Sequence, residues 1–318
     1  MAKRLVCRHT RAERMTPSRN IVVEHKHIPG LVDVIKVDQP ADILQIARDG
    51  TLDRAFGTGK PFLNSLLVRR ILGVLSLKGH RFPTMSARKA TGREIQQDAL
   101  WQRLNAIAPD IRTAPADLEP LAAWVRDTNT DVAVGPLVQQ VIGRLFSPTF
   151  EAGEATWAAA EVIAASLAPG NALRNLVWQV TGKVTRAKAL LASMVGGDLA
   201  GVHAVGVAIH NVVKGLNQMR GLYLDAAVRQ TLTPEMASRR CLFAPAVVLR
   251  QATEGGTVGG CPYSAGTLLL LELEKARQTG GDESMIFLAD TWSRCPAEQW
   301  VPAMLEGVWR RATSAHEQ

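Results

Sequence analysis

The stretch Ser293-Arg294-Cys295-Pro296-Ala297 decides how the fold of this chain is interpreted. An amphipathic segment follows it to about Ala312, and proline favours the first turn of a helix, so we expect Cys295 at a helix N-terminus. The N–H groups and the dipole of such an end favour an anion. Because a thiolate rather than a thiol binds a metal ion, Cys295 is a candidate metal ligand. The alternative is a small buried residue that merely begins a helix.

Most of the chain before this stretch has helical spacing. Apolar residues recur at helical intervals in 62–77, and we expect further helices at 40–48, 84–106, 117–127, 133–146, 151–168, 171–195 and 198–229. After Pro234, β-branched residues and glycines indicate small strands and turns. The prediction is a mainly α fold with small β elements, in a single domain over 1–318.

The first 30 residues are polar and basic, and they include His25 and His27. Histidines two positions apart could hold a metal on one face of a strand. No third ligand is close in sequence, so we expect a solvated strand or a flexible N-terminal arm instead. From Leu31 a loosely alternating apolar stretch predicts a strand.

Composition narrows the class of protein. Of 318 residues, 47% are hydrophobic and 21% charged, which is typical of a globular protein and unlike a disordered one. No apolar run approaches the ~20 residues of a membrane-spanning helix, and no signal peptide is evident, so we expect a cytoplasmic protein that does not bind a membrane. Four cysteines without a CxxC pair are expected to be reduced there.

The net charge is +8 and the pI about 9.6. Such a charge suits an acidic partner, either nucleic acid or an acidic electron-transfer protein. The basic residues are scattered and no aromatic residues stand among them, so we do not expect a nucleic-acid partner.

The order of motifs in the last 120 residues resembles that of the cytochrome P-450 family. The motifs are Ala200-Gly201-Val202-His203-Ala204, Arg239-Arg240, 245–250, Gly260-Cys261-Pro262-Tyr263-Ser264-Ala265-Gly266-Thr267 and Cys295-Pro296-Ala297. Residues 245–276 are similar to the Pro…Arg…Gly-Thr stretch of that family, and Cys-Pro-Ala to its ligand turn. Residues 42–49 resemble its strand–helix entry, and Gly79-His80-Arg81 with Arg88 resembles its haem-contacting helix.

This resemblance implies a haem-thiolate fold of reduced size, in which Cys295 ligates the iron of haem b. Haem carries two propionates, which need cationic partners. Arg250 is the first candidate, and His80, Arg81, Arg88 and Arg240 are further ones. Trp292 could pack beside the haem ring. For each basic residue the alternative is a solvated surface side chain.

Several motifs of the family differ here. The glycine-flanked aromatic loop before the cysteine is absent, and Ala237 stands where the Glu-x-x-Arg motif that ends at Arg240 needs a glutamate. His203 and Ala204 replace an acid–threonine pair. An imidazole can donate or accept a proton near neutral pH, whereas alanine cannot relay one. We therefore expect peroxide-driven oxidation, dehydration or rearrangement of a small organic substrate rather than ordinary monooxygenation, with His203 as the catalytic acid–base group.

Three alternatives stay open. His203 could be a satisfied core residue of an apolar helix. The chain could be a degenerate haem-fold protein that binds a ligand or a partner without catalysis. It could also be an all-helical protein with no haem.

Overall fold

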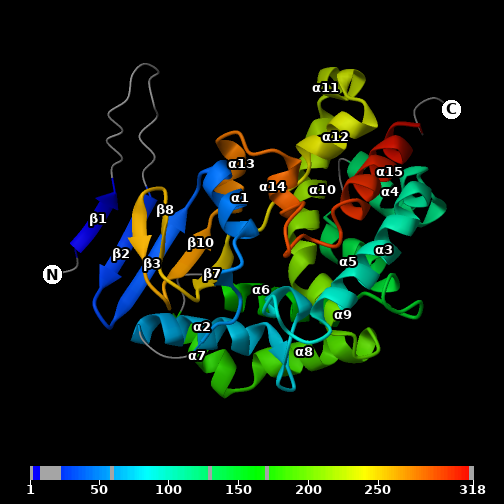
Figure 1. Cartoon of the computed structure of the whole chain (residues 1–318). Coiled ribbons are helices and arrows are strands. Elements are labelled where there is room, and N and C mark those ends of the chain that lie inside the picture. Colours follow the sequence, from blue (N-terminus) through cyan, green and yellow to red (C-terminus); the bar gives the residue numbers. More distant parts are fainter. Residues whose placement is uncertain (1–2, 8–22, 58–60, 128–130, 169–171, 315–318) are drawn as a thin grey trace, which may run out of the picture. The chain divides into compact units, whose positions relative to one another are not determined.

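A computed structural model describes residues 3–7, 23–57, 61–127, 131–168 and 172–314 (Figure 1). The chain divides into two compact units, each assembled from segments that are distant in the sequence. Unit 1 comprises Met1–Leu72, Thr84–Glu94 and Ala244–Cys295, and unit 2 comprises Gly73–Pro83, Ile95–Phe243 and Pro296–Gln318. The single domain over 1–318 stays a prediction.

Unit 1 contains a six-stranded sheet. Its order is β1 (Lys3–Cys7), β2 (Val23–Ile28), β3 (Val32–Val37), β10 (Leu268–Leu271), β7 (Val248–Ala252) and β4 (Leu52–Asp53). The β10–β3 pair is parallel and the other pairs are antiparallel. β10 lies between β3 and β7, and its four leucines suit a strand whose two faces are both largely buried.

The N-terminal segment belongs to this sheet where it is described. Residues 3–7 and 23–28 pair with each other, and 23–28 also pair with β3. The β2–β3 connection turns at Gly30, whose φ of 71° favours glycine. The predicted arm is thus largely strand in its described part, while residues 8–22 lie outside the described residues.

A second hairpin and three short helices complete unit 1. The hairpin pairs β8 (Gly256–Val258) with β9 (Cys261–Tyr263), in line with the small strands and turns predicted after Pro234, and both glycines of its turn, Gly259 and Gly260, have positive φ values. The helices are α1 (Pro40–Arg48), α13 (Leu273–Gln278) and α14 (Glu283–Phe287). The expectation of reduced cysteines is wrong for Cys261, which is disulfide-bonded.

Unit 2 is almost entirely helical. Its helices are α4 (Glu119–Arg126), α5 (Val134–Arg144), α6 (Glu154–Leu167), α7 (Ala172–Val180), α8 (Lys183–Met194), α9 (Leu199–His203), η3 (Ala204–Ala208), α10 (Ile209–Leu224), α11 (Ala226–Thr231), α12 (Pro234–Arg240) and α15 (Trp300–Ser314). A small hairpin pairs β5 (Ser76–Leu77) with β6 (His80–Arg81). Two helices, α2 (Phe62–Val74) and α3 (Arg93–Arg112), cross the unit boundary, as does the short turn η1 (Pro83–Met85); a further short turn is η2 (Ala116–Leu118).

Three helix predictions had wrong boundaries. The helix expected at 84–106 begins only at Arg93 and continues past Pro109 to Arg112. The helix expected at 171–195 is broken at Gly182, whose φ of 67° interrupts helical geometry. The last helix begins at Trp300, five residues after Cys295, because residues 296–299 form turns.

The stretch Leu199–Leu224 is long and apolar enough to cross a membrane by length and composition. It is continuous through α9, η3 and α10, and it packs against α4, α5, α6 and α12 within unit 2. Val202, Val205, Ile209 and Leu216 are fully buried there. The core of unit 2 therefore accounts for part of its apolar character, since 44% of its most apolar window is buried.

Candidate functional site

Three arginine side chains of unit 1 gather around one aromatic ring. The guanidinium carbons of Arg93, Arg250 and Arg54 lie 4.7, 5.0 and 5.4 Å from the centre of the Trp292 ring. All three arginines are buried, with exposed fractions of 6%, 0% and 6% respectively. Arginine almost never becomes fully buried without a partner, so this arginine cluster needs an explanation.

The sheet explains why Arg54 and Arg250 meet. Asp53 of β4 lies opposite Gln251 of β7, so the same register continued by one residue brings Arg54 opposite Arg250. Arg93 joins them from the first position of α3, where its Nη2 donates to the carbonyl oxygen of Trp292 at 2.9 Å. Three segments far apart in the sequence thus converge on Trp292.

Arg250 is only partly satisfied by protein acceptors. Its Nη1 donates to the Leu249 carbonyl at 3.0 Å and its Nη2 donates to the Ser293 hydroxyl at 2.5 Å. Among the described residues, the Nε of Arg250 and the Nε1 of Trp292 are buried and have no hydrogen-bond partner. Buried donors usually find an acceptor in native proteins, so these two are available to a ligand with acceptor oxygens.

The pKa values of the arginines also favour a ligand with acceptor oxygens at the arginine cluster. Burial, and then the positive charge of Arg93, lower the pKa of Arg250 to about 9. Burial, then the charges of Arg250 and Arg93, hold the pKa of Arg54 well below its ordinary value. The negative charge of Asp53 opposes both shifts. Three buried guanidinium groups thus lie close together in a low-dielectric setting.

Cys295 ends a loop that the same cluster holds in place. Its backbone N–H donates to the Phe287 carbonyl at 2.7 Å, which closes the loop of residues 287–295. Within the loop, Thr291 donates to the Leu288 carbonyl at 2.7 Å, and the Ser293 N–H donates to the Thr291 hydroxyl at 3.2 Å. Cys295 itself is half-buried and is a thiol rather than half of a disulfide.

The helix expected to begin at Cys295 begins later. Trp300 is the first residue of α15, although helical hydrogen bonds already reach back to the carbonyl of Ala297. Because the effect of a helix N-terminus fades within the first turn, its support for a thiolate at Cys295 is weaker than the sequence predicted.

His203 lies where the long helix of unit 2 changes from α-helical to π-helical geometry. It is the last residue of α9, and the next five residues form the π-helical segment η3. Buried Gln139 of α5 donates to the carbonyl of Val205 at 3.0 Å inside this segment. The half-buried ring of His203 meets Phe82 edge-on, with ring centres 6.0 Å apart. A π-bulge in a helix often marks a functional site.

The other predicted cofactor residues lie outside the arginine cluster. His80 and Arg81 form β6, where His80 is exposed and Arg81 half-buried. Arg88 is exposed; its N–H donates to Asp53 at 2.8 Å, and its guanidinium lies so close to Gly50 that a Cβ there would overlap it. Arg240 is exposed at the end of α12, where the neighbouring Arg239 pairs with Glu235 at 2.8 Å. A haem role for these four residues stays a prediction.

Sequence reasoning missed Arg54 and Arg93. Neither stands in a recognisable motif, and they precede Trp292 by 238 and 199 residues. The β4–β7 register brings Arg54 toward Arg250. Strands of two and five residues are too short for their register to be predicted from the sequence.

The donor set fits a ligand with two carboxylates. Three buried guanidinium groups lie around one aromatic ring, and arginine forks match carboxylate geometry. The residues present therefore fit the propionate end of haem.

Comparison with solved structures identifies the fold. A P-450 enzyme for C–S bond formation, CxnD, matches 87% of this chain and 79% of its own, with a TM-score of 0.58 and 12% identity. A variant of the P-450 OleT, solved with arachidonic acid, matches 91% and 82%, with a TM-score of 0.61 and 10% identity. The ligand-free P-450 monooxygenase TamI matches 98% and 80%, with a TM-score of 0.54 and 16% identity.

No family model matches the sequence, and no curated protein matches it either. The similarity to these solved structures nevertheless extends over 87–98% of this chain. The chain therefore has a mainly α, P-450-like fold that is shorter than those of its structural neighbours and divergent in sequence. The predicted fold class is confirmed.

Proposed function

We propose that this chain is a haem-thiolate enzyme that acts on a small organic substrate. The observation that carries the proposal is the arginine cluster of unit 1, in which the buried guanidinium groups of Arg54, Arg93 and Arg250 surround Trp292 and the buried Nε of Arg250 has no hydrogen-bond partner among the described residues. The P-450-like fold supports haem, which carries two propionates, as the ligand of this cluster. The half-buried thiol of Cys295, in the loop tied to Arg250 through Ser293, supports a thiolate ligand.

Each residue then has a distinct role. Arg250 and its neighbours bind the propionates, and Cys295 ligates the iron. When bound, thiolate-ligated haem supplies an iron centre disposed to O–O bond cleavage. His203 donates or accepts a proton at its imidazole, and the π-helical segment η3 begins at the next residue.

The reaction class follows from what stands beside His203. Ala204 carries no hydroxyl to relay protons, so ordinary monooxygenation is disfavoured and peroxide-driven oxidation, dehydration or rearrangement is favoured. The similar solved structures include an enzyme for C–S bond formation and another that was solved with a fatty acid, so this fold is compatible with different reactions. The net charge of +8 suits an acidic electron-transfer partner if reduction is needed.

The predicted cytoplasmic location is retained as part of the proposal, with one observation against it. Cys261 is disulfide-bonded, and disulfides are rare in reducing compartments. Thiol labelling of the native chain with and without reductant tests whether this bond persists inside cells.

Haem titration of the purified chain tests the proposal. We expect one haem per chain and, with peroxide, oxidation, dehydration or rearrangement of small organic acids or amines offered as substrates. Haem binding without turnover under either peroxide or reductant would instead indicate a binding protein of degenerate haem fold. Failure to bind haem would leave the arginine cluster unexplained and refute the proposal.

A further inference from the structure

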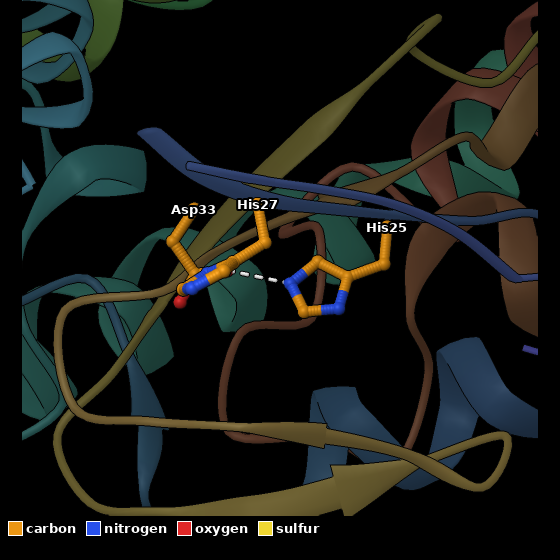
Figure 2. Close-up of side chains that lie close together, drawn as sticks. All are labelled: His25, His27 and Asp33. Carbon is orange, nitrogen blue, oxygen red and sulfur yellow. Dashed lines mark hydrogen bonds and ion pairs between the residues drawn. The ribbon is translucent and has the colours of Figure 1, made fainter. Parts of the chain in front are cut away.

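A second polar cluster lies on the β2–β3 hairpin of unit 1. His27 and Asp33 are directly opposite in the antiparallel register, and His25 stands two positions from His27, on the same face. Figure 2 shows the three side chains together on one side of the hairpin, with both rings turned toward the carboxylate. The absence of a third ligand, expected from the sequence, is wrong because the turn brings Asp33 back to the histidines.

The His25–His27–Asp33 cluster is compact enough for its three side chains to share one metal ion. One ligand atom of each residue lies within 4.8 Å of the other two. Nδ1 of His27 lies 3.5 Å from Oδ1 of Asp33, and Nε2 of His25 lies 2.6 Å from the same oxygen. Tetrahedral zinc with bonds of ~2.0–2.2 Å separates neighbouring ligand atoms by roughly 3.3–3.5 Å. The first distance already fits, and the second is a hydrogen bond that a cation would replace with a small shift.

Hydrogen bonds from neighbouring side chains hold Asp33 in place, as they do for carboxylates that bind metal ions. Its second oxygen, Oδ2, accepts from the Thr267 hydroxyl at 2.5 Å and from the Ser264 hydroxyl at 3.4 Å. The buried side chain of Asn64 accepts from the Asp33 N–H at 3.2 Å and donates to its carbonyl at 2.7 Å. These contacts leave Oδ1 directed at the two imidazoles. Such hydrogen bonds orient ligating carboxylates in metal sites.

Burial is graded across the cluster. The side chains of Asp33 and His25 are 4% and 9% exposed, whereas that of His27 is 40% exposed. Two ligands are therefore shielded from water, and the third offers an entry path. Three protein ligands also leave one tetrahedral position for water.

We propose that His25, His27 and Asp33 bind a divalent transition metal of the zinc class, independently of haem. Two imidazoles and one carboxylate suit zinc and its neighbours rather than magnesium or calcium, which prefer oxygen ligands. A hydrogen-bonded His25–Asp33 pair alone would account for two of the three residues. Asp33 pairs with both imidazoles in the structure, and such a pairing without a metal ion is the alternative that zinc binding distinguishes.

Zinc binding to the full-length chain, with haem as purified, tests this proposal. The chain is stripped with a chelator, equilibrated with Zn²⁺ and dialysed, and zinc is counted by mass spectrometry, so haem iron does not interfere. We expect one zinc per chain. His27→Ala removes one ligand and should weaken zinc binding at least about tenfold, since even the loss of a residue that supports a ligand costs that much. Asp33→Asn should weaken zinc binding similarly.

Lys26→Ala is the matched control, because Lys26 is exposed on the opposite face of the same strand. It should bind zinc as the native chain does, and zinc should raise the melting temperature of both but not that of His27→Ala. If Asp33→Asn does not fold, half-exposed His27 still carries the test. No zinc in the native chain, or equal zinc in His27→Ala, would overturn the proposal.

Discussion

Nη2 of Arg250 donates a hydrogen bond to the Ser293 hydroxyl at 2.5 Å, two residues before Cys295. Through Ser293 and Thr291 the buried arginine is connected to the loop that ends at the thiol. The proposed propionate partner and the proposed iron ligand are therefore parts of one hydrogen-bonded structure within unit 1. Substitution of either residue should therefore change haem binding.

Arg250→Met should weaken haem binding. It removes a buried cation whose hydrogen bond to a charged group contributes ~1.5–3 kcal/mol, which corresponds to about 10–150-fold in affinity. Haem titration followed by absorption measures the change. Arg239→Met is the control, since Arg239 forms an exposed pair with Glu235 and should leave haem affinity unchanged. Equal affinity of the native chain and Arg250→Met would count against the propionate role.

The same substitution should stabilise the chain when haem is absent. Replacing a buried, poorly compensated charge by an apolar side chain of similar length often gains ~1–4 kcal/mol. The pKa of Arg250 is about 9 in the folded chain and higher in the unfolded chain, so unfolding takes up protons. Native stability should thus rise as pH increases above about 9, and the advantage of Arg250→Met should shrink there.

Chemical denaturation of haem-free native chain and Arg250→Met, at neutral pH and above pH 9, measures this difference. With haem bound, the order of stabilities should reverse. A haem-free Arg250→Met chain that is less stable than the native one would show that the arginine cluster is satisfied without a ligand.

His203→Ala should reduce turnover by ~10²–10⁴-fold and leave haem bound, if the imidazole is the acid–base group. Rates are compared at matched haem content across a range of pH, because the native profile should contain a limb that the variant lacks. Gln218→Ala, at an exposed position of α10, is the control. Unchanged turnover would make His203 a core residue, and loss of haem would give it a structural or ligand role.

Two glycines of α10 give a paired stability test of unit 2. A Cβ at Gly215 would overlap the carbonyl oxygen of Cys241, whereas a Cβ at Gly221 would meet nothing within 4 Å. Gly215→Ala should therefore cost ~1–3 kcal/mol of unfolding free energy through overpacking. Gly221→Ala should gain ~0.5–1 kcal/mol, because alanine is the better helix residue. Thermal or denaturant unfolding of both variants checks the opposite signs.

The fold could be predicted from the sequence because its deciding features are local and ordered along the chain. Helical spacing gave most of unit 2, and the series from Pro245 through Thr267 to Cys295 indicated a P-450-like fold. Boundaries failed where local rules compete with packing, as at Pro109 inside α3 and Gly182 between α7 and α8. The π-helical segment after His203 has no sequence signature.

The candidate site was predictable only in part. Arg250 and Trp292 were singled out by their place among the motifs, but Arg54 and Arg93 join them through strand register and chain crossing. The histidine pair at 25 and 27 was visible, whereas Asp33 required knowledge of the hairpin register. Contacts between distant segments depend on tertiary packing, which single-residue patterns do not encode.

The absorption spectrum of the reduced carbon monoxide complex tests the central claim, that Cys295 is the thiolate ligand of a haem. The native chain should give the red-shifted Soret band that distinguishes thiolate from imidazole ligation. Cys295→Ser should lose that band, while Cys241→Ser, which changes a buried thiol in unit 2, should retain it. A native chain with no such band, or a Cys295→Ser chain that keeps it, would contradict the account.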